Sequence, residues 1–329
     1  MPLRLPPHIT SHIVTGAILC ALVGVCAFIK MSSNDKKKKN MSCANCGKGE
    51  EESGNLKSCV ACKMVKYCNR ECQIAHRPLH KKACKKRAAE LHDEKLFRDV
   101  EPDECPICML PLPIEGKEST FKSCCGKMIC NGCIHEMIMS EGNDLCPFCR
   151  TPPSSSNEEE IKRTNKLMDK GNAEAFHTLA GDYSEGIMGL PQDYQKANEL
   201  YLKAGELGCH VGYYNLGYSY ETGRGVETDG NKAEYYYELA AMNGSIQARN
   251  NLGCREGRGG NYQRAYKHFV MAAKAGDNIS LGNVQRGVME NIVSKDEYEN
   301  TLRSYQARQD EMKSDARDKA RASSGIFMR

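Results

Sequence analysis

The sequence has no tryptophan and only seven phenylalanines in 329 residues, which leaves few aromatic rings on which nucleic-acid bases would stack. It also lacks an excess of charge of one sign, because 46 lysines and arginines stand against 42 aspartates and glutamates for a formal net charge of +4. A nearly balanced charge gives no electrostatic reason to expect a nucleic acid. These absences argue against nucleic acid as the partner. The length of the chain is enough for roughly two or three structural units.

Cysteine, in contrast, is abundant and clustered. Fifteen of the 19 cysteines fall between Cys43 and Cys149, and ten of them form five Cys-x-x-Cys pairs. Such a grouping indicates either a disulfide framework in a secreted protein or zinc sites in a reducing compartment. Pairs two residues apart favour zinc, because a tight turn presents both thiolates to one tetrahedral ion about 2.3 Å from each sulfur. We therefore predict structural zinc and keep disulfides as the alternative.

The longest uncharged run lies near the amino terminus, over residues 13–29. Its 17 residues stand at the short limit of the about 17 to 25 that a membrane-spanning helix needs. Lysines follow the run over residues 30–39 and only Arg4 precedes it, so the positive-inside rule predicts a cytoplasmic face for everything downstream. The same charge order is opposite to that of a cleaved signal peptide. Translation from Met31 or Met41 would remove the span and leave a cytoplasmic protein.

The first cysteine block occupies residues 42–84 and reads CANC, CVAC, YCNREC and QIAHRPLHKKAC. It supplies seven cysteines and two histidines, enough ligands for two zinc ions. The block resembles a MYND-type zinc finger, whose pattern is two Cys-x-x-Cys pairs, Tyr-Cys-x-x-x-Cys-Gln and a terminal His-Lys-x-x-Cys. The resemblance selects His80 as the histidine ligand and leaves His76 as the spare.

The MYND family interleaves its ligands along the chain. The resemblance therefore implies one ion bound by Cys43, Cys46, Cys68 and Cys72 and another bound by Cys59, Cys62, His80 and Cys84. So small a module has almost no apolar core, and most of its folding free energy would come from metal binding. MYND fingers bind short proline-containing peptides, but Arg77 stands where many of them carry tryptophan. A purely structural zinc knob is the alternative.

Two segments without cysteine separate the modules. Acids and bases alternate from Lys85 to Arg98, so we expect residues 85–104 to form a charged connector, helical and of mixed charge rather than a basic patch. Residues 151–165 begin with TPPSSSNEEE, in which turn formers and a run of acids indicate a linker.

The second cysteine block occupies residues 105–150 and reads CPIC, SCCGKMICNGC and CPFC. This order of pairs and singles resembles a RING-type zinc finger, whose ligands also interleave. The resemblance implies one zinc bound by Cys105, Cys108, Cys130 and Cys133 and another bound by Cys124, Cys125, Cys146 and Cys149.

Cys124 and Cys125 depart from the RING pattern because they are adjacent. Successive side chains point apart in an extended chain, so both sulfurs reach one ion only through a local kink, which Gly126 would relieve. Without that kink, His135 or a water molecule would replace one of the two cysteines.

The second block contains no catalytic nucleophile, and a closed tetrahedral zinc site cannot activate water. RING fingers act instead as ubiquitin ligases, which dock a ubiquitin-conjugating enzyme and hold its thioester-linked ubiquitin in a reactive pose. By resemblance, Ile107 and Pro147 would form the apolar dock, with Met137 in place of the usual tryptophan. Arg150 would hydrogen-bond both the conjugating enzyme and ubiquitin, a task that suits a planar guanidinium. Turn packing and a solvated charge are the simpler interpretations of these residues.

Residues 166–280 contain three aligned segments, AFHTLAGDYSEG, GYYNLGYSYETG and ARNNLGCREGRG. Leu179 and Tyr183 recur as Leu216 and Tyr220, one helical turn apart on a single face. In the helix that follows, a set of alanine, aromatic and alanine recurs as Ala197, Tyr201 and Ala204, then Ala233, Tyr237 and Ala240, then Ala265, Phe269 and Ala272. Each unit is therefore a helical hairpin that buries its apolar face only against its neighbours, as in an α-solenoid.

The helical hairpins resemble SEL-one-like repeats, relatives of the tetratricopeptide family, which bind partner proteins on a concave surface. The resemblance implies recruitment of substrates or adaptors. A left-handed cap is expected to end each second helix at Gly208, Gly244 and Gly276. Cys209 and Cys254 are interpreted as buried or surface thiols, and residues 281–329 as a charge-rich helical tail without a motif.

These patterns predict a multidomain fold of two small cross-braced zinc modules followed by an all-α solenoid of helical hairpins. Residues 1–41 would add a membrane anchor and its basic flank. The favoured function is a ubiquitin ligase or ligase subunit with four structural zinc ions, counted from the two ligand sets of each block. The alternatives are a non-enzymatic adaptor and a nuclear transcriptional regulator that acts through the MYND-like finger.

Overall fold

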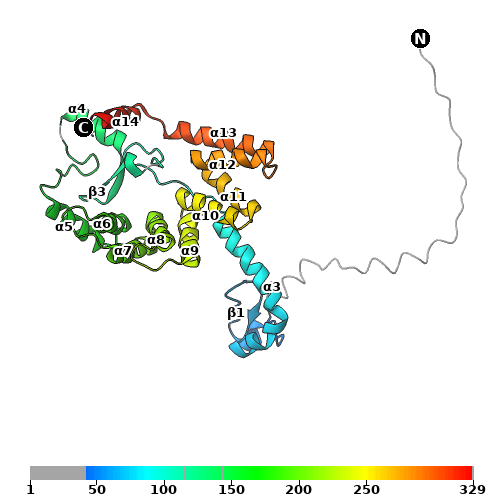
Figure 1. The fold of residues 1–329 in the computed structure, drawn as a ribbon. Helices are drawn as coiled ribbons and strands as arrows, with labels where there is room; N and C mark the ends of the chain where they lie inside the picture. Colours follow the sequence, from blue (N-terminus) through cyan, green and yellow to red (C-terminus); the bar gives the residue numbers. More distant parts are fainter. Residues whose placement is uncertain (1–41, 115, 143, 328–329) are drawn as a thin grey trace, which may run out of the picture. The chain divides into compact units, whose positions relative to one another are not determined.

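The computed structural model describes residues 42–327 apart from residues 115 and 143 (Figure 1). The chain forms two compact units, one that ends at Leu91 and one that begins at His92. The predicted membrane span at residues 13–29 lies outside the described residues. Among the helices that are described, none is both long enough and apolar enough to cross a membrane.

The first unit is organised around cysteine. Its elements are α2 (Glu50–Ser53), the antiparallel strands β1 (Lys57–Ser58) and β2 (Lys66–Tyr67), and α3 (Arg70–Leu96), which continues into the second unit. Three of the five residues in its buried core are cysteines: Cys43, Leu56, Cys59, Cys62 and Tyr67. The unit therefore buries little apolar surface of its own.

The second cysteine block forms a small ββα module within the second unit. The 3-10 turn η1 (Gly116–Glu118) leads into the antiparallel strands β3 (Ser119–Lys122) and β4 (Lys127–Cys130), and α4 (Asn131–Glu141) follows at once. Gly142 ends α4 in the left-handed conformation and donates its N–H to the Ile138 carbonyl. Ile129 is fully buried among the cysteines of the module.

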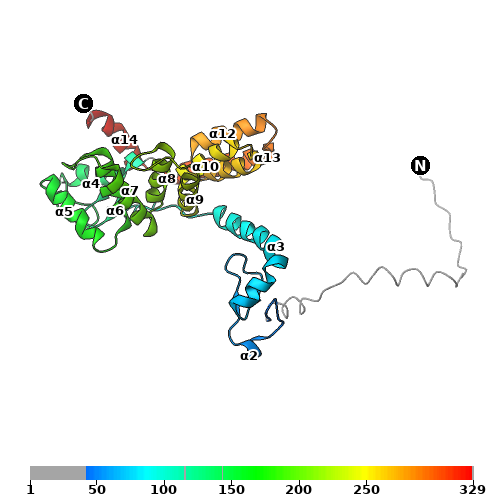
Figure 2. The ribbon, with the colours of Figure 1, turned by 60° about the horizontal axis from the view of Figure 1, so that its bottom comes forward.

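The remaining helices form a solenoid in which consecutive helices pack side by side (Figures 1 and 2). They are α5 (Asn157–Met168), α6 (Ala173–Glu185), α7 (Tyr194–Glu206), α8 (His210–Thr222), α9 (Gly230–Met242), α10 (Ile246–Arg258), α11 (Tyr262–Lys274), α12 (Asn278–Met289) and α13 (Lys295–Met312). The last helix, α14 (Asp315–Phe327), packs against α4 instead. The predicted solenoid of helical hairpins is confirmed. Its helices differ from the predicted bounds at both ends, because α5 begins at Asn157, inside the predicted linker 151–165, and α12 and α13 extend beyond residue 280.

The recurring positions of the repeats form the solenoid core. All three alanine, aromatic and alanine sets are buried, and Tyr237 is fully inaccessible to solvent. The helices approach closely where glycine faces a ring: a Cβ on Gly217 would lie 2.8 Å from the Tyr237 ring, and one on Gly253 would lie 2.6 Å from Phe269. The predicted left-handed caps are present, since φ is +104° at Gly208, +101° at Gly244 and +107° at Gly276.

The end of α3 packs into this solenoid within the second unit. Leu96 is fully buried in the cluster that contains Tyr237. The guanidinium of Arg249 is buried and donates to the carbonyls of Leu96 at 2.9 Å and Arg98 at 3.2 Å. The predicted connector is therefore helical up to Leu96, and its last turn forms part of the repeat core.

Candidate metal centres

One turn recurs at four of the Cys-x-x-Cys pairs. The residue after the second cysteine has a positive φ and donates its N–H to the carbonyl of the first cysteine at 2.8–2.9 Å. These residues are Gly47, Lys63, Met109 and Arg150, with φ between 58° and 76°. The turn directs both thiols of a pair toward one point, as a tetrahedral metal site requires. The fifth pair differs because Cys130 is the N-cap of α4 and Cys133 lies in its first turn.

The first unit brings its predicted ligands together in two groups of four, Cys43, Cys46, Cys68 and Cys72, and Cys59, Cys62, His80 and Cys84. Neighbouring sulfurs lie 3.5–3.7 Å apart, close to the about 3.8 Å edge of a tetrahedron with zinc–sulfur bonds of about 2.3 Å. His80 Nε2 lies 3.2 Å from Cys62 Sγ. His76 lies outside both groups, and its Nδ1 is 3.0 Å from the Tyr67 hydroxyl.

The second finger also brings its predicted ligands together in two groups, Cys105, Cys108, Cys130 and Cys133, and Cys124, Cys125, Cys146 and Cys149. Sulfur separations are 3.5–3.9 Å in the first group and 3.4–3.8 Å in the second. His135 takes no part in either group, because its Nε2 is 3.0 Å from the Ser323 hydroxyl. All described cysteines are free thiols, so the structure contains no disulfide in these modules.

A tight turn after β3 allows Cys124 and Cys125 to face the same point. The N–H groups of Cys125 and Gly126 both donate to the Lys122 carbonyl, at 3.2 and 2.7 Å. Gly126 has a φ of +71°, which a residue with a Cβ adopts only under strain. Asn172 of the solenoid donates its Nδ2 to the Gly126 carbonyl at 3.1 Å. The kink expected from the sequence is therefore present at this glycine.

The donor sets fit structural zinc. Fifteen thiols and one imidazole provide four ligands at each of four points, and all ligand atoms of a group lie within 4.8 Å of one another. Sulfur and imidazole nitrogen are the ligands of closed tetrahedral zinc sites. Burial and the neighbouring Cys59 thiol raise the pKa of Cys84 to about 12. A bound zinc ion would displace such protons and hold the thiolates together.

The residues expected to dock a conjugating enzyme have different degrees of exposure. Ile107 is 40% exposed on its cysteine turn, Pro147 is half-buried, and Met137 of α4 is only 8% exposed. The side chain of Arg150 is directed toward Met137, and its Nη1 lies 3.8 Å from the Met137 sulfur. The exposed isoleucine and arginine therefore come from the two turns, and α4 supplies a buried apolar support.

Helix α14 is a part of the second finger that the sequence analysis did not identify. It packs along α4, where a Cβ on Gly132 would lie 2.7 Å from the Arg317 backbone nitrogen (Figure 1). Arg317 is 3% exposed and donates through Nη1 to the carbonyls of Pro111 and Met312, both at 2.9 Å. Arg321 pairs with Glu118 at 2.6 Å. The carboxyl-terminal helix thus completes the finger's packing.

Comparisons with known proteins match the first finger and the repeats. The family profile of the MYND finger matches residues 43–84, and that of the Sel1 repeat matches residues 178–209, 210–245 and 246–277. These matches confirm both resemblances and indicate a role in protein–protein interaction, as an adaptor or scaffold. The RING-like assignment of the second finger is suggested by its cysteine clusters.

One curated relative and two solved structures are similar to part of this chain. The "ERAD-associated E3 ubiquitin-protein ligase component HRD3B" of Arabidopsis thaliana is 32% identical over 112 residues, or 34% of this chain and 17% of that protein. The match thus spans about a sixth of that relative. A Sel1 repeat protein from Oxalobacter formigenes has a TM-score of 0.41 and 22% identity over 54% of this chain and 71% of that one. The protective antigen c5321 of uropathogenic Escherichia coli, which displays an SLR fold, has a TM-score of 0.40 and 25% identity. The match covers 46% of this chain and 33% of that one.

Proposed function

We propose that the chain is a ubiquitin ligase, or a subunit of one, in which the second finger docks a ubiquitin-conjugating enzyme and the Sel1 repeats recruit the protein to be modified. The observation that carries the proposal is the arrangement of Ile107, Met137 and Arg150 on two cysteine turns and α4. The partial match to a protein named as a component of a ubiquitin ligase supports it.

This site is expected to act by positioning the conjugating enzyme and its bound ubiquitin. Each metal point in the second finger has four protein ligands, so a bound zinc ion would have no open position for water. Ile107 would insert into the conjugating enzyme as an apolar contact. Arg150 would donate hydrogen bonds to both the enzyme and its bound ubiquitin, because a guanidinium carries five donors in one plane. Fixing the thioester in a reactive orientation is what accelerates transfer to a lysine.

Ile107 and Arg150 remain exposed although α14 packs on the same finger. Successive residues of an α-helix are about 100° apart, so Met137 lies about 140° around α4 from Gly132. Gly132 is the position that contacts the Arg317 backbone. Helix α14 and the proposed dock therefore use different sides of α4.

Ubiquitin transfer with purified components tests the proposal. The full chain, incubated with activating enzyme, ubiquitin and a panel of conjugating enzymes, should form ubiquitin chains. The rate should fall about tenfold or more in Ile107→Ala and Arg150→Gly, the loss of roughly 1.4 kcal/mol of docking energy. Glycine at residue 150 also relieves the positive φ of 61°, so a loss of transfer there would not come from strain in the turn.

Val60→Ala is the matched control, because Val60 is 79% exposed on a cysteine turn of the first finger. It should leave the rate unchanged. No chains with any conjugating enzyme, or equal rates in the parent and Ile107→Ala, would overturn ligase activity.

A non-enzymatic adaptor is the second candidate, and Met137 favours it. A buried methionine offers a conjugating enzyme less contact than an exposed ring would. The MYND finger would then bind peptides, and Leu79, which is 83% exposed, is apolar surface available to them. Binding of proline-containing peptides that Leu79→Ala weakens, in a chain that transfers no ubiquitin, would establish this alternative.

For location, we propose that residues 13–29 anchor the chain with its fingers on the cytoplasmic face of a membrane. The full chain should stay in the membrane pellet after alkaline extraction, and a chain that begins at Met31 should not. A carboxyl-terminal tag found in the nucleus would instead favour a transcriptional regulator.

A further inference from the structure

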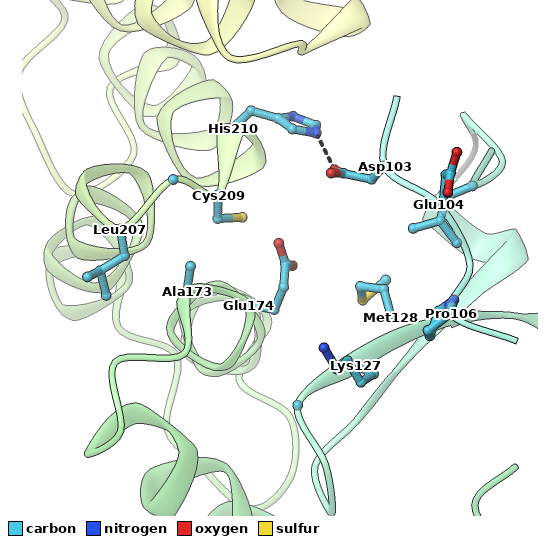
Figure 3. A pocket seen from close by; sticks show the side chains of 13 residues that line it. Asp103, Glu104, Pro106, Lys127, Met128, Ala173, Glu174, Leu207, Cys209 and His210 are labelled. Carbon is cyan, nitrogen blue, oxygen red and sulfur yellow. Dashed lines mark ion pairs between the residues drawn. The ribbon is translucent and has the colours of Figure 1, made fainter. Parts of the chain in front are cut away.

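A pocket of about 380 Å³ lies between the second finger and the first repeats, inside the second unit. The finger contributes Asp103 and Lys127, and the solenoid contributes Glu174, Cys209 and His210. In Figure 3 the Cys209 sulfur and the Glu174 carboxylate point toward one another across this space, and His210 turns to Asp103. The pocket thus gathers groups that bind metals and that belong to none of the fingers' ligand sets.

Two of these groups, Glu174 and Cys209, form a compact set with a neighbouring residue of α6, His177. Ligand atoms of Glu174, His177 and Cys209 all lie within 4.8 Å of one another, the same limit that the finger groups meet. Glu174 and His177 stand one turn apart on α6, and His177 Nδ1 is 3.9 Å from Glu174 Oε2. Cys209, which precedes α8, is 4% exposed. A carboxylate, an imidazole and a thiol on two neighbouring helices therefore converge from three directions.

The repeats themselves show that Cys209 is exceptional. It occupies the N-cap position of α8, and the equivalent residues of α6, α10 and α12 are Asn172, Ser245 and Asp277. Each of those three side chains accepts a backbone N–H, as N-caps do, whereas Cys209 makes no such bond. The sulfur is directed toward α6 instead.

His177 departs from the repeats in the same way. In the third unit its place is taken by Asn250 and that of Glu174 by Gln247. Neither of those residues has an imidazole or a carboxylate to offer. The residues that break the repeat pattern are thus the ones that meet in space.

Two neighbours fit the environment of a metal. The Asn215 amide lies 3.3 Å from His177 Nε2. With the amide oxygen turned to the ring, Asn215 would accept a hydrogen bond from the Nε2–H group. The lone pair on Nδ1 of His177 would then be available to a metal. The buried Nδ1 of His210, next to Cys209, has no hydrogen-bond partner among the described residues. Because His210 lines the pocket, the pocket wall contains a buried polar atom without a partner among the described residues.

We propose that Glu174, His177 and Cys209 form a further metal site that binds zinc, with water from the pocket as the fourth ligand. Mixed sulfur, nitrogen and oxygen donors suit zinc or cobalt, and three protein ligands leave one position open. Binding would form a zinc–sulfur bond and release the Cys209 proton to solvent. Burial, followed by the charge of Glu174, raises the pKa of the Cys209 thiol. The thiol of the empty site is therefore protonated, and this proton competes with the metal for the sulfur. The ion would link α6 to α8 beside the second finger.

Zinc counting on the full chain tests the site. Cys209→Ser and His177→Asn place at each position the residue that the third unit carries, Ser245 and Asn250, so both variants should fold. After dialysis against a weak chelator, each should contain one zinc ion less per chain than the parent. Cys254→Ser is the matched control, because Cys254 is a partly buried cysteine in none of the ligand groups. It should retain the parent's zinc content.

Cobalt substitution gives a second measurement. The parent should take up one more cobalt than Cys209→Ser, and the difference spectrum should show charge transfer from a single thiolate. The affinity of this further site for cobalt should fall on the order of 100-fold or more in His177→Asn. Equal metal content in the parent and both folded variants would overturn the site. If one variant fails to fold by circular dichroism, the other decides.

Discussion

The Arg317 Nη2 atom lies 3.6 Å from the Cys108 sulfur, although 209 residues separate the two in the chain. The guanidinium is buried, and its Nη1 is fixed by two carbonyls. A zinc ion with four thiolates has an excess of negative charge, so a buried cation with an N–H directed at one sulfur stabilises it. The end of the chain thereby supports a metal centre near its middle.

Arg317→Ala should accelerate zinc loss from the second finger about 10- to 100-fold, the usual cost of removing a partner that supports a metal ligand. Release into a chromophoric chelator measures this rate. Arg321→Ala is the control, since Arg321 forms an exposed ion pair with Glu118. Equal release rates in the parent and Arg317→Ala would contradict the role of this guanidinium.

Gly132→Ala should displace α14, because the added Cβ would lie 2.7 Å from the Arg317 nitrogen and 3.0 Å from the Ala316 carbonyl carbon. Backbone atoms of a packed helix cannot yield as a flexible side chain does. Hydrogen exchange should become faster in residues 315–327. Gly181→Ala in α6 has nothing within 4 Å of its Cβ and should raise stability by up to about 1 kcal/mol. Unchanged exchange in α14 would show that the helix is not held at Gly132.

Stability should depend on pH through His268. Burial, together with Arg249 and Arg264, lowers its pKa to about 3 from 6.5, and the nearby Asp93 acts in the opposite direction. The unfolded chain takes up the proton below about pH 6.5 and the native chain does not. Above pH 6.5, His268 is neutral in both states and does not lower the stability. Below pH 6.5, the free energy of unfolding declines by about 1.4 kcal/mol per pH unit as pH falls toward 3.

His268→Phe isolates this effect from protonation of the zinc ligands. It keeps a ring beside Phe97, whose centroid is 4.7 Å away, and removes two ring nitrogens without hydrogen-bond partners among the described residues. Between pH 7 and pH 5, the free energy of unfolding should fall by about 2 kcal/mol more in the parent than in the variant. Denaturant unfolding at both pH values measures the difference. Parallel pH dependences would refute the assignment to His268.

Removing zinc should affect the two kinds of module differently. The core of the first unit is mostly cysteine and lacks the apolar area to fold alone, whereas Leu96, Tyr237 and Leu252 form an apolar cluster without cysteine. A strong chelator should make amides of residues 42–69 exchange freely while those of α8 and α9 stay protected. Loss of protection in α9 at the same chelator concentration would mean that the solenoid also depends on metal.

The ligand sets and repeats were predictable because both depend on local spacing. A Cys-x-x-Cys pair makes its own turn, as the shared hydrogen bond at Met109 and Arg150 shows. Tyr201 and Tyr237 stand at fixed intervals from small residues, so their burial follows from helical periodicity.

Contacts made by the tail were not predictable in this way. Arg317 is one of many charges in the carboxyl-terminal helix, and no spacing distinguishes it from Arg321. Its partner Cys108 is reached only through the tertiary fold. Cys209 did carry a signal, since a cysteine replaces the expected N-cap residue, but the signal has meaning only beside His177, which the fold brings near.

Native mass spectrometry of the Cys209→Ser chain, combined with a count of free thiols, is the most direct test of the two zinc modules. Four groups of ligands predict four zinc ions per chain and no disulfide among the fifteen cysteines of the fingers. Substantially fewer zinc ions, or those cysteines joined to one another in freshly isolated protein, would contradict it.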